Sequence, residues 1–180
     1  MKRNLGSYWW TIAVTGLCVA MAPAAGAQEP ASSPNKELVR RFNTVCNERH
    51  YAALAELVQP NFRRHCQATP AVTVKSLEEF QKFLGADAST FPDAHTTFNQ
   101  LIEEGDRVAF WGTYEGTQKG AMGPFPPSMK KIVLDVSGVF RIEGGKIAEL
   151  WIIWDNMSVF TQLELKPTEQ APDNGVPKNE

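Results

Sequence analysis

The spacing of hydrophobic residues changes once along this 180-residue chain, and that change constrains the fold more than any other feature. Between Asn35 and Leu84 apolar residues recur every three or four positions, which is typical of amphipathic helices. From about residue 94 they alternate with polar residues, which is typical of half-buried strands. Helices followed by strands predict an α+β domain in which the helices cover one face of an antiparallel sheet.

Local signals place the helices. The first is expected from Asn35, which could cap it, to residue 48. A second, shorter helix should end at Pro60, and residues 61–69 are expected to be irregular. A third should begin at Ser76, because Glu79 three residues later completes a capping box.

The alternating half predicts four strands, separated by Gly-containing turns and by one longer Gly/Pro-rich loop at 120–129. Their expected ranges are about 94–103, 107–118, 130–143 and 146–156. A strongly curved sheet wrapped round the helices would form a cone with a cavity inside. Concave, mostly apolar cavities are where small ligands usually bind.

The first 27 residues have the order of a cleavable signal peptide. Lys2 and Arg3 precede an apolar stretch, Tyr8–Met21, and small residues follow at Ala25 and Ala27. We expect cleavage after Ala27 and a periplasmic or secreted protein. The alternative, an uncleaved anchor, is less favoured because the stretch is shorter than the roughly 20 residues that span a bilayer.

The remaining chain is expected to form one domain, over residues 35–165. Residues 28–34 are rich in Pro and Ser and predict a flexible linker, and residues 166–180 predict a disordered tail.

The net charge limits the possible binding partners, and the cysteines leave one disulfide possible. Loss of Lys2 and Arg3 with the leader would move the formal net charge from −2 to −4. No stripe of basic residues remains to bind nucleic acid, and no membrane association is expected after cleavage. Two cysteines remain, Cys46 and Cys66. In an oxidising compartment they could form a disulfide or stay as unpaired core residues, and the sequence favours neither.

The last predicted strand carries the carboxylate of greatest interest. Alternation places Trp151 and Asp155 on one face, and Leu150, Ile152 and Trp154 on the other. If the first face looks into the cavity, Asp155 would lie among apolar walls and be tuned for acid/base chemistry. The alternative is that Asp155 caps the turn after the strand.

Several short motifs in order resemble the SnoaL-like polyketide cyclases, ester-cyclase-type members of the nuclear-transport-factor-two-like superfamily. The resemblance covers about residues 35–165 and implies the cone-shaped fold. It is carried by Glu104-Gly105-Asp106-Arg107-Val108, Gly116-Thr117, Pro126-Pro127, Phe140-Arg141-Ile142-Glu143-Gly144-Gly145-Lys146-Ile147, Trp151 and Asp155.

The resemblance also implies a reaction. In the family's cyclases the carboxylate that corresponds to Asp155 acts as general acid/base in an intramolecular aldol closure, without metal or cofactor. His65 corresponds to a family histidine and would be its polar partner. Such chemistry is reasonable, because a carboxylate can remove a proton beside a carbonyl while a nearby donor stabilises the enolate oxygen.

Departures from the family pattern point toward ligand binding. Gln118 stands where many relatives have His, and Trp111 where a basic residue is common. With Trp151, Phe125 and Asp135 they make up the expected ligand-binding set. Asp135 could enter the cavity opposite the catalytic acid, or lie on a solvated outer face.

Together these features predict an exported domain that binds a small hydrophobic carbonyl compound, with ester cyclase or isomerase activity. The alternatives are a non-enzymatic binding protein and an unrelated reaction on the same fold. The histidines lack metal-ligand spacing, so no metal and no cofactor are expected. A homodimer is expected through the outer sheet face, which Leu150, Ile152 and Trp154 would make apolar.

Overall fold

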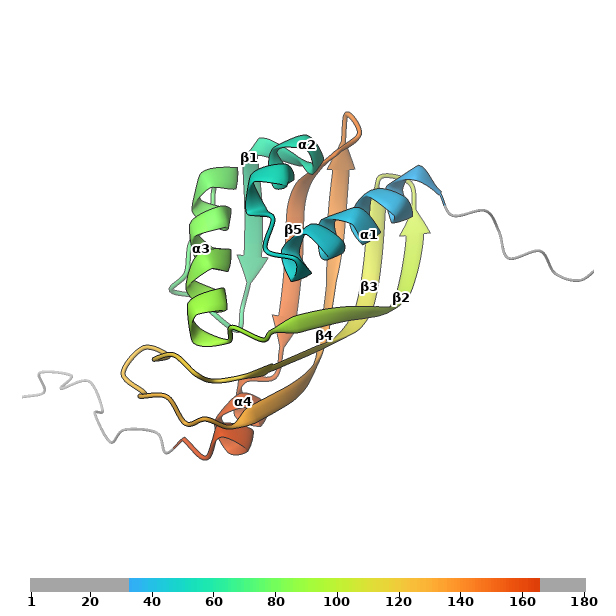
Figure 1. The fold of residues 1–180 in the computed structure, drawn as a ribbon. Coiled ribbons are helices and arrows are strands. Elements are labelled where there is room, and N and C mark those ends of the chain that lie inside the picture. The colour runs from blue at the N-terminus through green and yellow to red at the C-terminus, as the bar shows by residue number, and fades with distance from the viewer. Residues whose placement is uncertain (1–32, 166–180) are drawn as a thin grey trace, which may run out of the picture. The chain divides into compact units, whose positions relative to one another are not determined.

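The computed structural model describes residues 33–165, which form helices and one five-stranded sheet (Figure 1). In Figure 1, α1 and α3 lie on the same side of the sheet. In chain order the elements are α1 (Pro34–Asn47), the 3₁₀ turn η1 (Tyr51–Ala53), α2 (Leu54–Leu57), β1 (Val58–Cys66), α3 (Leu77–Thr90), β2 (His95–Glu104), β3 (Arg107–Thr117), β4 (Lys131–Glu143), β5 (Lys146–Trp154) and α4 (Asn156–Leu163).

The sheet is mixed but mostly antiparallel, in the order β1-β5-β4-β3-β2. Strands β2 to β5 form the expected antiparallel meander, whereas β1 pairs in parallel with β5. The predicted α+β class, with N-terminal helices on a predominantly antiparallel sheet, is therefore confirmed.

The expectation that residues 61–69 are irregular was wrong for residues 61–66, because Val58–Cys66 forms the edge strand β1, and it holds for residues 67–69. Pro60 and Asn61 disfavour a strand locally. The register with β5 shifts between Val58 and Arg63, so Pro60 and Asn61 lie in an irregular part of the strand, and regular pairing resumes at Arg63. Pairing with the exposed edge of β5 therefore outweighs the local propensity.

Side-chain caps start the two long helices. Ser33, not Asn35, caps α1 by accepting a hydrogen bond from the Lys36 amide at 3.2 Å, while the Asn35 amide donates to Glu103. Ser76 caps α3 as predicted and accepts from the Glu79 amide at 3.1 Å.

Two glycines let neighbouring strands approach closely on the concave face of the sheet. A β-carbon on Gly138 would lie 2.2 Å from the backbone oxygen of Trp151, and one on Gly112 would lie 2.6 Å from the oxygen of Thr97. The ring of Phe110 covers Gly138, so side chains larger than hydrogen are excluded at this point. These positions shape the hollow side of the sheet.

The predicted signal peptide (1–27), most of the linker (28–34) and the tail (166–180) lie outside the described residues, and they stay predictions. The helix α1 already begins at Pro34. No helix within residues 33–165 is long and apolar enough to cross a bilayer. Cys46 and Cys66 are both free thiols in this structure.

Candidate functional site

A cavity of about 510 Å³ lies between the helices and the concave face of the sheet. Its walls come from α1, α3, α4, the sheet and the loop before β4, and they are mainly apolar. Aromatic rings contribute much of this surface: Phe80, Phe83, Phe91, Phe110, Phe140 and Trp154. A hollow of this size and character suits a small hydrophobic molecule.

A carboxyl group and a phenol face each other in the cavity wall. Asp87 on α3 follows Phe80, Phe83 and Leu84 at helical spacing, so it shares their inward stripe. The Tyr114 hydroxyl on β3 lies 3.2 and 3.3 Å from the two Asp87 oxygens and donates to them. This pair is a candidate for proton transfer.

Burial sets the protonation of the pair. Loss of solvation raises the pKa of Asp87 above its ordinary value, and the hydrogen bond from Tyr114 offsets only part of this rise. Burial also raises the pKa of Tyr114, so the phenol keeps its proton and acts as a donor at neutral pH.

A third polar group in the wall is the guanidinium of Arg64 on β1, a residue that is 7% exposed. It lies 4.3 Å from the centre of the Phe83 ring and 5.6 Å from that of Trp154. Its Nη1 donates to the Thr69 hydroxyl at 3.2 Å. Aromatic faces, the Thr69 hydroxyl and the Cys66 thiol thus hold a positive charge at the cavity.

Two further polar side chains of the lining are engaged or unreactive. The Tyr51 hydroxyl donates to the Leu84 carbonyl at 3.3 Å. Burial raises the pKa of Cys46 to about 12, so its thiol stays protonated and is a poor nucleophile.

Asp155, the predicted acid/base, does not line the cavity. It is exposed, and its Oδ1 accepts a hydrogen bond from the Met157 amide at 2.8 Å as the N-cap of α4. The expected inward placement was therefore wrong, and the alternative, a cap after the last strand, is the one observed. Strand β5 ends at Trp154, and the chain turns into a helix that was not predicted.

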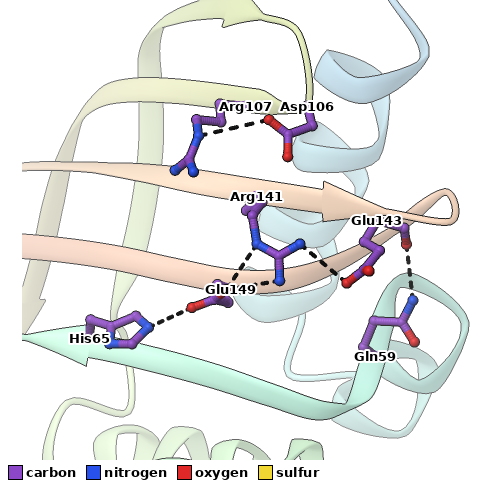
Figure 2. A network of polar contacts seen from close by, with 7 residues as sticks. All are labelled: Gln59, His65, Asp106, Arg107, Arg141, Glu143 and Glu149. Carbon is purple, nitrogen blue, oxygen red and sulfur yellow. Dashed lines mark hydrogen bonds and ion pairs between the residues drawn. The ribbon is translucent and has the colours of Figure 1, made fainter.

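His65 also lies away from the cavity, on the outer face of the sheet. Figure 2 shows its ring directed at Glu149, with Nε2 2.8 Å from Oε2. Arg141 donates to the other Glu149 oxygen at 2.8 Å, and the His65 ring stacks on Trp151 with centroids 4.8 Å apart. The hydrogen bond from His65, with help from Arg141, holds the pKa of Glu149 below its ordinary value. His65 and Trp151 thus belong to a polar surface network.

Of the five predicted ligand-binding residues, only Phe125 lines the cavity. Trp111, 48% exposed, and Asp135, also exposed, lie with Trp151 on the outer face. Gln118 is fully buried but serves the loop: it donates to the carbonyls of Gly120 and Pro126 and accepts from the Ser128 amide. Gln118 therefore holds the loop backbone in place and does not contact a ligand in the cavity.

Most of these residues were misplaced for one reason: the wrong face of β5 was assigned to the cavity. Strand β5 is apolar on both faces, so alternation alone does not identify its inner face. Strand β4 does, because its inward positions are consistently apolar (Ile132, Leu134, Val136, Phe140) while Asp135 and Arg141 alternate with them. Through the pairing of β4 with β5, Leu150, Ile152 and Trp154 then face the cavity. They do not supply the outer apolar surface expected of them.

Three polar residues of the cavity wall, Asp87, Tyr114 and Arg64, were not predicted from the sequence. Asp87 had a recognisable signal, because a carboxylate in the apolar stripe of a helix faces the core. Tyr114 follows from the inner face of β3, which it shares with Phe110. Arg64 gave no such signal, since its strand was not expected.

Comparison with protein families supports the resemblance. A model of the SnoaL-like polyketide cyclase family matches residues 36–163. The chain belongs to this family. No functionally curated protein matches it.

Several solved structures share the fold of this chain. TsrD from Streptomyces laurentii is 27% identical, with a TM-score of 0.64 over 72% of this chain and 94% of TsrD. IdmH from Streptomyces antibioticus is 23% identical, with a TM-score of 0.65 over 73% and 99%. A SnoaL-like polyketide cyclase from Agrobacterium tumefaciens is 18% identical, with a TM-score of 0.61 over 73% and 98%. The fold therefore spans almost the full length of these proteins.

Proposed function

We propose that this SnoaL-like domain binds a small hydrophobic carbonyl compound in its cavity and that Asp87 is the general acid/base there. The observation that carries the proposal is the Asp87–Tyr114 pair, hydrogen-bonded at 3.2–3.3 Å in a mainly apolar hollow of about 510 Å³. Asp87 takes the role that the sequence assigned to Asp155, which the structure places in solvent.

The proposed chemistry needs no redox partner. Asp87 removes a proton from the carbon beside a carbonyl; the electron pair of that C–H bond forms a C=C bond, and the π pair of the carbonyl moves to its oxygen, which gives an enolate. In a cyclase, the enolate carbon would then bond to a second carbonyl of the same molecule. The resulting alkoxide would recover the proton from Asp87, so that no atoms are gained or lost.

The raised pKa of Asp87 supports both halves of this cycle. A base whose pKa approaches the working pH removes a carbon-bound proton better than an ordinary exposed carboxylate does, and it also returns the proton readily. Tyr114 would orient the carboxylate and restrain its motion through the hydrogen bond.

A second candidate is a binding protein without catalysis. It is favoured by the position of Asp155 and His65, the pair that the family resemblance implied, which both lie outside the cavity. In that case Asp87 and Tyr114 would only recognise a polar group of the ligand.

Proton exchange separates the two candidates. We expect the protein to accelerate exchange of the acidic C–H protons of 2-tetralone with deuterium oxide, followed by proton NMR. Asp87→Asn should reduce this rate by about 100-fold or more while it binds 2-tetralone with similar affinity. The matched control is Asp135→Asn, since Asp135 is exposed on the outer face. Exchange that persists in Asp87→Asn would refute the assignment, and binding without exchange in the natural protein would favour the second candidate.

We also propose, from residues 1–27, that the protein is exported to the periplasm or secreted. N-terminal sequencing of the mature protein tests this, and a start at Gln28 is the expected result.

The homodimer through the outer sheet face also stays a proposal, now with other residues of that face. Trp111, Val133 and Ile153 are each about half exposed on the outer face of the sheet. Burial of these side chains against a second copy would remove them from water.

A further inference from the structure

The positive charge of Arg64 has no carboxylate partner among residues 33–165. None of the ion pairs in this part of the chain includes it. Its polar contacts are the Thr69 hydroxyl and the Cys66 thiol, and its flat faces meet Phe83 and Trp154. Buried charges in proteins are normally paired, because desolvation of an isolated ion is costly.

The rest of the guanidinium is open to the cavity. It carries several N–H donors, of which Nη1 is used by Thr69. The contacts with Thr69 and Cys66 use only part of these donors. Arg64 lines the cavity, so a ligand bound there lies within reach of its guanidinium.

The lining holds two other charged residues, and neither forms an ion pair with Arg64. They are Arg49 and Asp87, so the charged lining is formally one positive charge in excess. Arg49 donates to the backbone carbonyls of Asn47 and Pro92, and Asp87 accepts from Tyr114. Arg49 is held at backbone carbonyls, whereas Arg64 sits between the aromatic rings Phe83 and Trp154, so we take Arg64 as the cation that binds an anionic ligand.

We infer that the natural ligand is an amphiphilic anion, a carboxylate on an apolar body, with the carboxylate bound by Arg64. This rests on the proposed function, because it specifies the ligand class of the same cavity. A guanidinium binds a carboxylate through two parallel N–H···O bonds, a geometry that an ester or a ketone does not offer.

The position of Arg64 also orients the ligand. Phe83, which the guanidinium covers, precedes Asp87 by one turn on the same face of α3. A carboxylate at Arg64 would extend its apolar body along the aromatic wall. A carbonyl about one helical turn away would then face Asp87, so a hydrophobic keto acid fits both groups.

A matched pair of probes tests the inference without any mutation. The probes are 2-naphthoate and its methyl ester, which share the apolar body and differ in charge, measured by isothermal titration calorimetry at pH 7.5. We expect 2-naphthoate to bind about tenfold more tightly or better. Arg64→Met should weaken 2-naphthoate by a similar factor and leave the ester within about threefold, whereas Arg64→Lys should keep part of the preference.

The adjacent Arg63 supplies the control, because it is exposed and precedes Arg64 on the alternate side of β1. Arg63→Met should retain the full preference for the carboxylate. Equal or tighter binding of the ester by the natural protein would overturn the inference and leave the proposed cavity function standing. If neither probe binds, both the inference and the proposed function fail.

Discussion

Gly138 gives the sharpest test of how the sheet makes room for the cavity. It lies on β4 opposite Ile152 of β5, with the Phe110 ring across it. An alanine β-carbon here would lie 2.2 Å from the Trp151 carbonyl oxygen and 2.7 Å from a ring carbon of Phe110. The first neighbour is backbone, so it cannot rotate away.

The expected cost follows from these distances. Carbon–oxygen contacts between strands are normally about 3.3 Å or longer, so β4 and β5 would have to separate by about 1 Å. Overpacking of this kind costs about 1–3 kcal/mol, and each weakened ladder hydrogen bond adds about 1 kcal/mol. Gly138→Ala should therefore destabilise the domain by about 3 kcal/mol, which corresponds to a fall in Tm of about 10 °C.

The control is another glycine in the same chain. Gly85 lies inside α3, and a β-carbon there would meet nothing within 4 Å. Gly85→Ala should raise the free energy of unfolding by about 0.5–1 kcal/mol, because alanine loses less backbone entropy in a helix. Circular dichroism during thermal and urea unfolding measures both variants. A Tm for Gly138→Ala equal to that of the natural protein would refute the argument from close strand approach.

Three further predictions concern protonation, the loop and the outer face. Burial raises the folded-state pKa of Asp87, so its contribution to stability is complete below the ordinary Asp pKa and is lost as pH rises through the raised value. The Tm of Asp87→Asn relative to that of the natural protein should therefore be higher at pH 8 than at pH 4. The same Tm difference at both pH values would contradict this. Gln118→Ala should cost about 2–3 kcal/mol in urea unfolding, because it leaves buried loop groups unpaired, whereas a neutral effect would mean that water replaces the amide. Sedimentation velocity at micromolar concentration should show a dimer that Trp111→Asp dissociates, and a monomeric natural protein would reject the outer-face interface.

The antiparallel meander could be predicted because each of its signals is local. Alternating residues set β2 to β5, and glycines at the hairpins fix their order. The start of α3 was equally predictable, since Ser76 and Glu79 form a cap within one turn. By contrast, β1 depends on the free edge of β5, which is distant in sequence, so residues 61–69 showed no strand pattern of their own.

The site could be predicted only in part, because alternation defines two faces without saying which one is hollow. The inner face was assigned from Asp155, although the uniformly apolar positions of β4 identify it more securely. The partnership of Asp87 and Tyr114 joins a helix to a strand across 27 positions, and no local pattern reports such a contact. Phe125 was placed correctly in the cavity wall.

The interior anchoring of the loop by Gln118 has a consequence for the thermodynamics of recognition. This loop carries Met122 and Phe125 into the cavity wall, and three hydrogen bonds from one buried amide fasten its backbone. A ligand therefore binds to a surface that is already ordered before it arrives. Little of the association free energy would be spent on freezing the chain, so a modest number of contacts could suffice for tight binding.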